Sequence, residues 1–435
     1  MSAAPDSGNE QTGFFSKLVF WYGHALGWRE LLARFALGLF CIALWHNGLF
    51  YSAIPVLALA WLVDGGLFKL DRLIKQPLVW GILVFCGVWL LGLLWSDFPA
   101  AFEGKWKKYF ILLTFIPFFA LLNNNRWPWA VGALLSGYVG ILALGSYQWA
   151  IEGAQGIPWL KFSYLGYSAA IGTGVILAAF YGCIAATRRR ACFSWLLALL
   201  LLFLQFNQSS RGLLVATLAA LLLILVLRYR IEGRKLMASL TAAVVAIAVF
   251  AASSDVLQER LYQAGTDLRL FQQGHYQTSL GYRLAMWEIG LRGIAERPLL
   301  GHGAGMARQY FDEQIVTHQQ GIYRNLPEFQ KTVHFHNEWI EVGVHLGLLG
   351  ISAWVFLLWC WFQAFKRCRM GLLGAAMVCY IVMAGLSHVF LLFSRIPPLL
   401  LVITALVICW RQQQPNESDT IDDTSLTAHE ATADA

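Results

Sequence analysis

Long apolar runs separated by short polar or basic stretches make up most of the chain. An α-helix needs roughly 20 apolar residues to cross the hydrocarbon core of a bilayer. By this criterion the pattern predicts about twelve membrane-spanning helices, some of them short for a complete crossing. The predicted spans are residues 31–46, 50–63, 77–95, 109–122, 127–150, 164–187, 192–206, 213–229, 235–252, 338–365, 372–393 and 397–410.

Composition agrees with this pattern. Hydrophobic residues make up 58% of the 435 positions and charged residues only 13%, with a mean hydropathy of +0.57. A soluble domain of this composition would expose large apolar patches and aggregate. The chain is therefore predicted to be an all-α integral membrane protein surrounded by membrane lipids.

Basic residues in the short loops predict the orientation, because Lys and Arg are enriched on the cytoplasmic side of membrane proteins. With the N-terminus in the cytoplasm, basic clusters at 69–75, 188–190, 228–235 and 366–369 all become cytoplasmic. The net charge of +7 then reflects topology, and no motif for binding nucleic acid accompanies it. The predicted parts are a cytoplasmic segment 1–30, nine spans in 31–252, an external loop 253–335, three spans in 336–410 and a disordered cytoplasmic tail 411–435.

The external loop is predicted to contain amphipathic helices. From Gly281 to Arg297 apolar residues recur at helical spacing, and Pro298 ends the pattern. The apolar positions are Leu284, Trp287, Leu291 and Ile294. The glycines at 301, 303 and 305 follow, where the backbone is able to approach a ligand closely. This stretch is either a phosphate cradle or an ordinary turn.

Polar residues gather where the chain enters the span at 338–365. His336 is a candidate general base, because burial keeps an imidazole neutral and able to accept a proton. His334 is an alternative base, and Glu338 is near enough in sequence to orient either imidazole. Asn337 is predicted either to bind substrate or to cap the helix. An interfacial histidine bonded to a carbonyl is the plainer interpretation of His336.

Two arginines are predicted on the same external side. Arg211 lies between two apolar runs, and Arg283 lies on the predicted amphipathic helix. Guanidinium groups bind phosphate through planar, paired hydrogen bonds, so a lipid-linked diphosphate is the expected ligand. The alternatives are an Arg211 that reaches lipid headgroups and an Arg283 on an ordinary charged face. The external parts contain no Asp-x-Asp metal motif, so we expect no metal ion and no other cofactor.

The motifs together resemble a known family. His336-Asn337 is followed after nine residues by Gly347-Leu-Leu-Gly350. Upstream lie Ser210-Arg211-Gly212 and the stretch from Arg283-x-x-x-Trp287 to Pro298-x-x-Gly301-x-Gly303. Between about 200 and 410 the chain is similar to the bacterial O-antigen ligases and their relatives, the O-antigen polymerases and protein O-oligosaccharyltransferases.

The resemblance implies a metal-independent, inverting glycosyltransferase of the C-type membrane architecture, in the bacterial inner membrane. It would move O-antigen from undecaprenyl diphosphate to the lipid A-core oligosaccharide on the periplasmic face. His336 would help activate the acceptor hydroxyl, while Arg211 and Arg283 would hold the diphosphate. Ligases often carry an acidic residue near the position of His388. Its role would fall to Glu338 or Glu341, or the acceptor is bound differently.

Three other functions also fit. A protein O-oligosaccharyltransferase uses the same donor lipid, and a polymerase joins two lipid-linked repeats. The modest external segment, without a large extra domain, favours the ligase. A lipid or solute transporter would account for many spans without catalysis. However, the halves show no internal repeat, and the charges gather at one face instead of the midplane.

Overall fold

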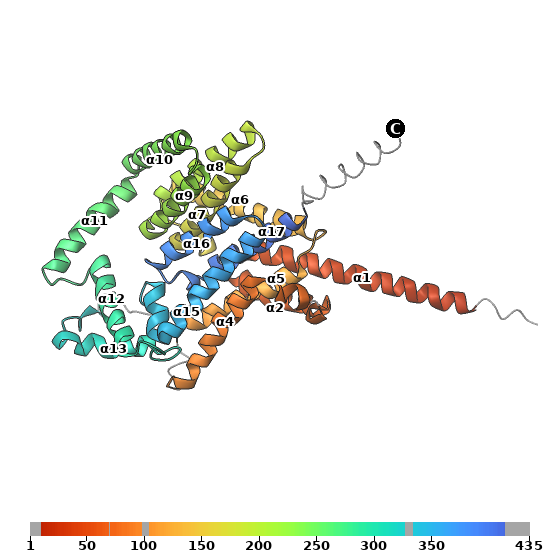
Figure 1. The fold of residues 1–435 in the computed structure, drawn as a ribbon, viewed down its shortest axis with the longest axis horizontal. Helices are drawn as coiled ribbons and strands as arrows, with labels where there is room; N and C mark the ends of the chain where they lie inside the picture. The colour runs from red at the N-terminus through yellow and green to blue at the C-terminus, as the bar shows by residue number, and fades with distance from the viewer. Residues whose placement is uncertain (1–9, 69, 98–103, 327–333, 414–435) are drawn as a thin grey trace, which may run out of the picture.

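The computed structural model describes residues 10–68, 70–97, 104–326 and 334–413. Helices make up most of these ranges, and the β-type pairing found in them is an isolated bridge between Ile157 and Phe162. The all-α integral membrane protein predicted from sequence is therefore confirmed (Figure 1). The first nine residues, the tail beyond Gln413 and residues 327–333 of the predicted external loop lie outside the described residues.

Within the described ranges, seven helices are long and apolar enough to cross a membrane. They are α4 with its 3-10 extension (Pro77–Trp95), α6 (Trp127–Glu152), α7 (Tyr164–Ile184), α8 (Arg188–Phe206), α9 (Arg211–Tyr229), α10 (Gly233–Ser253) and α15 (Glu338–Arg367). Shorter apolar helices are α2 (Asn47–Val63), α16 (Gly371–Gly385) and α17 (Ile396–Gln412). The long helix α1 (Glu10–Ala43) runs through the first predicted span.

One predicted span differs from a simple crossing helix. Residues 109–122 fall in a 3-10 helix, η4 (Lys105–Thr114), followed by the short helix α5 (Phe115–Leu121). The sequence correctly indicated an apolar helical segment here, but the segment combines a 3-10 helix, which has tighter turns, with a short α-helix. This composite, the three shorter helices and α1, which is not among the seven, account for the difference from about twelve predicted spans.

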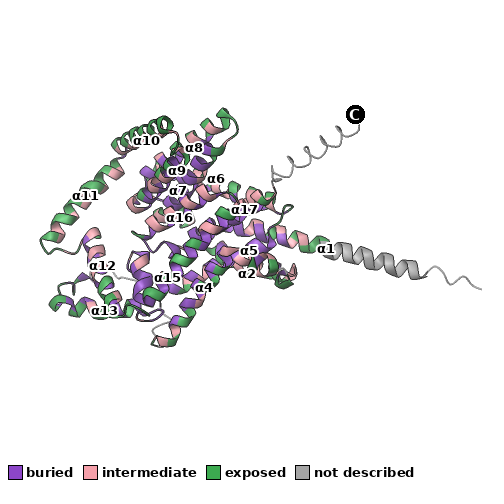
Figure 2. Cartoon of the chain, viewed as in Figure 1, coloured by how far each residue is buried: buried purple, intermediate pink, exposed green. Residues whose placement is uncertain are grey.

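The segment predicted to be external is helical as expected in its described residues, although one helix buries a partly different face. It contains α11 (Asp255–Gln272), α12 (Ser279–Glu296) and α13 (Ala307–Thr317). On α12 the predicted apolar stripe is only partly buried, since Trp287 and Ile294 pack against the buried cluster whereas Leu291 is 58% exposed. The helix packs against α15 and α13 through Tyr282, Ala285, Met286 and Ile289. Figure 2 shows the contrast with α10 and α11, which are largely exposed.

A break in α15 determines the geometry of this region. Gly347 has φ 57° and ψ −149°, which interrupts the helix between Leu346 and Leu348. Only glycine adopts this backbone conformation readily. The segment 348–367 continues beside α4 (Figure 1), while the segment 338–346 lies against α12. The break therefore separates a membrane-crossing part from an outer part.

The loop after α12 fills this break. Leu348 and Leu349 donate backbone hydrogen bonds to the carbonyls of Pro298 and Leu299, at 2.8 and 3.1 Å. In return, the backbone N–H groups of His302 and Gly303 donate to the carbonyls of Val344 and His345, at 2.9 and 2.8 Å. The close approach predicted for this glycine-rich stretch is therefore to the backbone of α15, and not to a phosphate.

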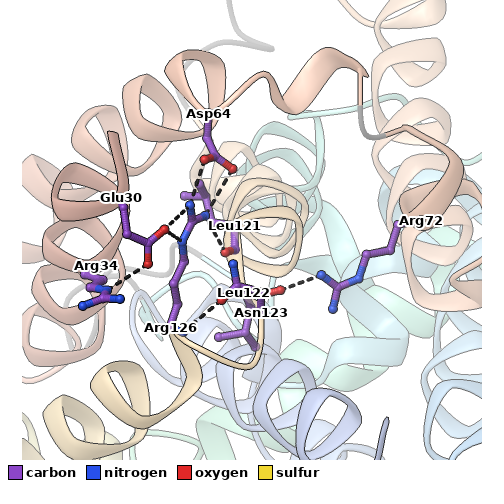
Figure 3. A network of polar contacts seen from close by, with 8 residues as sticks. All are labelled: Glu30, Arg34, Asp64, Arg72, Leu121, Leu122, Asn123 and Arg126. Atoms are coloured by element: carbon purple, nitrogen blue, oxygen red, sulfur yellow. Dashed lines mark hydrogen bonds and ion pairs between the residues drawn. The ribbon is translucent and has the colours of Figure 1, made fainter. Parts of the chain in front are cut away.

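A second polar network ties helix ends together at the opposite end of the bundle (Figure 3). Arg126, at the start of α6, is only 5% exposed. Its guanidinium forms a bidentate ion pair with the carboxylate of Asp64, at 2.8 and 3.1 Å. It donates a hydrogen bond to Glu30 at 2.8 Å. It also donates to the carbonyl of Leu121. One arginine thus joins α1, α2, α5 and α6.

We predict that Gly347→Ala destabilises the protein by about 1–3 kcal/mol, because alanine does not adopt this conformation without strain. A Cβ atom at this position would also lie 2.6 Å from the backbone of Leu299. The measurement is thermal unfolding of the purified variant in detergent. Gly87→Ala in α4 is the control, since a Cβ atom there meets nothing within 4 Å. Equal melting temperatures for the two variants would contradict the proposed role of the break.

Candidate functional site

The predicted site residues come together at one end of the helices, although they belong to four separate parts of the chain. Arg211 begins α9, and Arg283 lies in the second turn of α12. His334, His336 and Asn337 immediately precede α15, while His388 follows α16. Their charges act on one another, since His334, Arg283 and His388 each lower the pKa of His336.

The peptide between the two histidines is held from both sides. Phe335 is 1% exposed, and its carbonyl accepts a hydrogen bond from the indole Nε1 of Trp287 at 3.1 Å. Its N–H donates to Oε2 of Glu341 at 2.8 Å. Thus α12 and the outer part of α15 together fix the backbone that carries His334 and His336.

His336 has the properties expected of a neutral base. Its φ of 51° lies in the left-handed region, a strained conformation for a residue with a side chain. Its ring lies 4.2 Å from the ring of His334, centre to centre, at nearly a right angle. Burial, followed by the charges of His334 and Arg283, lowers the pKa of His336 to about 2. The imidazole is therefore uncharged near neutral pH, and a pKa this low makes it a weak base in this arrangement of charges.

The two arginines form a positive pair beside the histidines. Burial lowers the pKa of Arg283, and the neighbouring charge of Arg211 adds to this effect, while Tyr164 opposes it. Arg211 donates a hydrogen bond to the backbone carbonyl of Arg260 on α11. Among the described residues, neither guanidinium forms an ion pair with a carboxylate. Asp267 is near enough to oppose the lowering of the pKa of Arg211, but partly buried cations that form no close ion pair still favour an anionic ligand.

Asn337 has the capping role that was one of its two predicted roles. Its Oδ1 accepts hydrogen bonds from the backbone of Trp339 and Ile340, at 3.0 and 3.2 Å. Its Nδ2 donates to the carbonyl of Leu386 at 3.1 Å. The cap therefore also joins the start of α15 to the end of α16. This junction holds the nearby His388, which is 4% exposed, in the cluster.

Glu338 does not contact either imidazole that the sequence assigned to it. Its Oε1 accepts a hydrogen bond from the hydroxyl of Tyr109 at 2.6 Å, and its Oε2 accepts one from the N–H of Leu391 at 2.9 Å. The side chain is 1% exposed. It points inward from the first turn of α15 and joins η4 to the chain after α16. This geometry makes it a structural link instead of an orienting base.

Sequence reasoning missed a second polar connection. Glu341 holds Phe335 through one oxygen, and its other oxygen lies 3.4 Å from Nε2 of His345. The Nδ1 atom of His345 lies 3.1 Å from both the N–H of Gly305 and the carbonyl of Gly303. The spacing of four residues between Glu341 and His345 could have indicated this pair. The connection links the histidine loop to the glycine-rich loop.

The donor atoms present suit an anion better than a metal ion. Within the described part of the chain, no three His, Cys, Asp or Glu side chains are placed to hold a metal. The carboxylates nearest the histidines are occupied, because Glu338 and Glu341 accept hydrogen bonds from Tyr109 and from the backbone. The cluster that faces a ligand therefore consists of arginine and imidazole nitrogens.

Comparison with known proteins agrees with this arrangement. Residues 195–355 match the model of the family described as O-antigen ligase. This part of the chain is therefore similar to that family. It is 35% identical over 153 residues to an O-antigen ligase of Escherichia coli (strain K12), covering 35% of each protein. It is 28% identical over 106 residues to an uncharacterized protein of Haemophilus influenzae (strain ATCC 51907 / DSM 11121 / KW20 / Rd), covering 23% of this chain and 25% of that protein.

The family resemblance predicted from sequence is thus confirmed. The chain aligns with about a third or less of the length of these curated relatives. The matched residues 195–355 include Arg211, Arg283 and His336. His388 and Tyr109 lie outside the matched residues, so the fold brings further side chains to the site from both flanking regions.

We predict that His336 makes the protein less stable in acid. The pKa of His336 is lower in the folded protein than its usual value of about 6.5, so the unfolded chain takes up a proton that the folded chain does not. Lowering the pH from about 7.5 to about 5.5 should therefore cost about 1 kcal/mol of stability through this residue.

The measurement is thermal unfolding of wild type and His336→Asn across this pH range. The variant should lose less stability on acidification. The exposed His275 supplies the control, because His275→Asn should behave like wild type. If the stability of His336→Asn depended on pH as the wild-type stability does, the low pKa assigned to His336 would be refuted.

Proposed function

We propose that this protein is an O-antigen ligase that transfers polysaccharide from undecaprenyl diphosphate to the lipid A-core oligosaccharide. The observation that carries the proposal is the placement of two arginines that form no ion pair among the described residues beside a partly buried, neutral His336. Such a site offers donors for a diphosphate and an acceptor for a proton. The match to the O-antigen ligase family supports the same conclusion.

In the proposed reaction, His336 takes the proton from the acceptor hydroxyl as its oxygen attacks the anomeric carbon of the donor sugar. The bond from that carbon to the diphosphate oxygen breaks, and undecaprenyl diphosphate leaves with the electron pair. Attack opposite the leaving group inverts the configuration. A bound diphosphate would offset the charge of Arg283, one cause of the low pKa of His336. Donor binding would thereby make the imidazole a stronger base.

The arginines would supply the charge stabilisation that many transferases obtain from a metal ion. Negative charge develops on the diphosphate as the sugar–oxygen bond breaks, and fixed cations nearby lower that barrier. Guanidinium groups are charged at any physiological pH. We therefore propose a metal-independent enzyme of the C-type membrane architecture.

We further propose that the site faces the periplasm from the bacterial inner membrane and that both termini are cytoplasmic. Helix direction supports this orientation. The site lies at the start of α9 and α15, whereas basic residues cluster at their far ends, around 228–235 and 366–369. The positive-inside rule then assigns the site to the external side.

We predict that the purified protein transfers polysaccharide from its undecaprenyl diphosphate carrier to lipid A-core, with chelator present and no nucleotide. His336→Asn should lose at least about 100-fold in rate, because a positioned base contributes roughly this much. Asparagine tolerates the left-handed backbone, so the fold should survive. The product is detected on a gel as a lipid A band of lower mobility.

Transfer by His336→Asn at the wild-type rate would remove this residue from the mechanism. Loss of wild-type activity in chelator, restored by a divalent cation, would overturn the metal-free account. Transfer to a protein, or joining of two lipid-linked repeats, would identify a different enzyme of the superfamily.

We predict that Arg283→Lys lowers activity by about tenfold or more, because lysine keeps the charge but loses the paired hydrogen bonds to a diphosphate. The Michaelis constant for the lipid-linked donor should rise. Arg292→Lys on the same helix is the matched control, since Arg292 is exposed and pairs with Glu296 at 2.9 Å. Equal effects of the two substitutions would argue against a diphosphate at Arg283.

A further inference from the structure

A second positively charged site adjoins the histidines. A cavity of about 270 Å³ opens between η4, the start of α7 and the start of α17. Its lining includes Lys105, Lys108, Lys161, Arg395, Ser163 and His334. Arg211, Arg283 and His336 do not line it. His334 thus lines this cavity, and its ring lies 4.2 Å from that of His336, centre to centre.

Arg395 is a buried cation that lines this cavity. It is 6% exposed, and its guanidinium carbon lies 4.2 Å from the centre of the Phe162 ring. Its Nη1 is buried, and no hydrogen-bond partner for it occurs among the described residues. Leaving a charged donor unsatisfied in this way is costly, so the group is expected to bind an acceptor from a ligand.

The other lining residues point to the same ligand chemistry. Four cationic side chains line the cavity, and no carboxylate is among its described lining residues. Lys108 donates to the hydroxyl of Ser394 at 3.2 Å, which leaves its charge uncompensated. Burial lowers the pKa of Lys105, and the charge of Lys108 adds to this effect, while Glu341 opposes it. The repulsion among these groups is relieved when a multiply charged anion binds.

We propose that this cavity binds a phosphate group of the acceptor glycolipid and so positions the acceptor at the histidines. This inference rests on the proposed function. Inversion requires the acceptor oxygen to approach the anomeric carbon from the side opposite the diphosphate. With the diphosphate at Arg211 and Arg283, which do not line this cavity, an acceptor held by Lys105 and Arg395 would reach the histidines through His334, which does line it. The site thus selects a phosphorylated acceptor.

The test measures binding to the full-length protein in nanodiscs of phosphatidylcholine, without donor. The probes are the lipid A-core glycan with its phosphates and the same glycan after phosphate removal. Wild type should bind the phosphorylated probe about tenfold or more tightly, the difference expected for one charged hydrogen-bonded group. Lys105→Gln and Arg395→Gln should lose most of that preference. Lys107→Gln, outside the cavity lining on the same segment, should retain it.

Activity measurements add a second readout. In Lys105→Gln the Michaelis constant should rise about tenfold for the acceptor and stay near the wild-type value for the donor. Equal binding of the two glycans by wild type would overturn the proposal. If the Michaelis constant of Lys105→Gln rose for the donor alone, the proposal would also be overturned, and the cavity would be assigned to the diphosphate.

A membrane phospholipid is the other source of the same phosphate chemistry. If Lys105→Gln weakened binding of phosphatidylglycerol but left glycan binding unchanged, the cavity would be a lipid site and the proposal would fall. The binding measurement is made without donor, so it does not depend on the transfer reaction. Phosphate-dependent glycan binding without any transfer would therefore support this cavity while refuting the ligase activity.

Discussion

The geometry of the whole site depends on the break in α15 at Gly347. A continuous helix of 30 residues would be about 45 Å long, well beyond the hydrocarbon thickness of about 30 Å. The break lets the segment 338–346 turn against α12 while 348–367 crosses beside α4. An interrupted helix leaves backbone groups without partners, and the loop 298–303 supplies them. A structural requirement in the membrane thus brings α12 and its arginine to the histidines.

This arrangement concentrates positive charge and removes the groups that would neutralise it. Glu338 and Glu341 are the acidic residues closest in sequence to His336, and both accept hydrogen bonds from structural partners. The basic side chains of Arg283 and Arg395 therefore remain without carboxylates among the described residues. Such repulsion lowers the stability of the empty protein, and an anionic substrate would restore it. At the other end of the bundle, Arg126 is fully paired, which is the ordinary outcome for a buried arginine.

Several errors of sequence reasoning have one origin. The periodicity of α12 predicted the helix correctly. Packing against α13 and α15, however, buries a face that coincides only partly with the predicted apolar stripe. The glycines at 301 and 303 indicated a close approach, but not whether a ligand or another backbone would make it. Glu338 was near the histidines in sequence, yet the first turn of a helix points successive side chains in different directions.

The sequence alone determined that this is a helical membrane protein that resembles the O-antigen ligases, and it indicated Arg211, Arg283 and His336 as candidate site residues. Hydrophobic content decides between lipid and water as the surroundings, and this property is additive along the chain. Only the tertiary structure decided which of these residues meet, that Glu341 instead of Glu338 supports the histidine loop, and that Lys105 and Arg395 share a cavity. These outcomes depend on contacts between residues far apart in sequence, and no local pattern encodes such contacts.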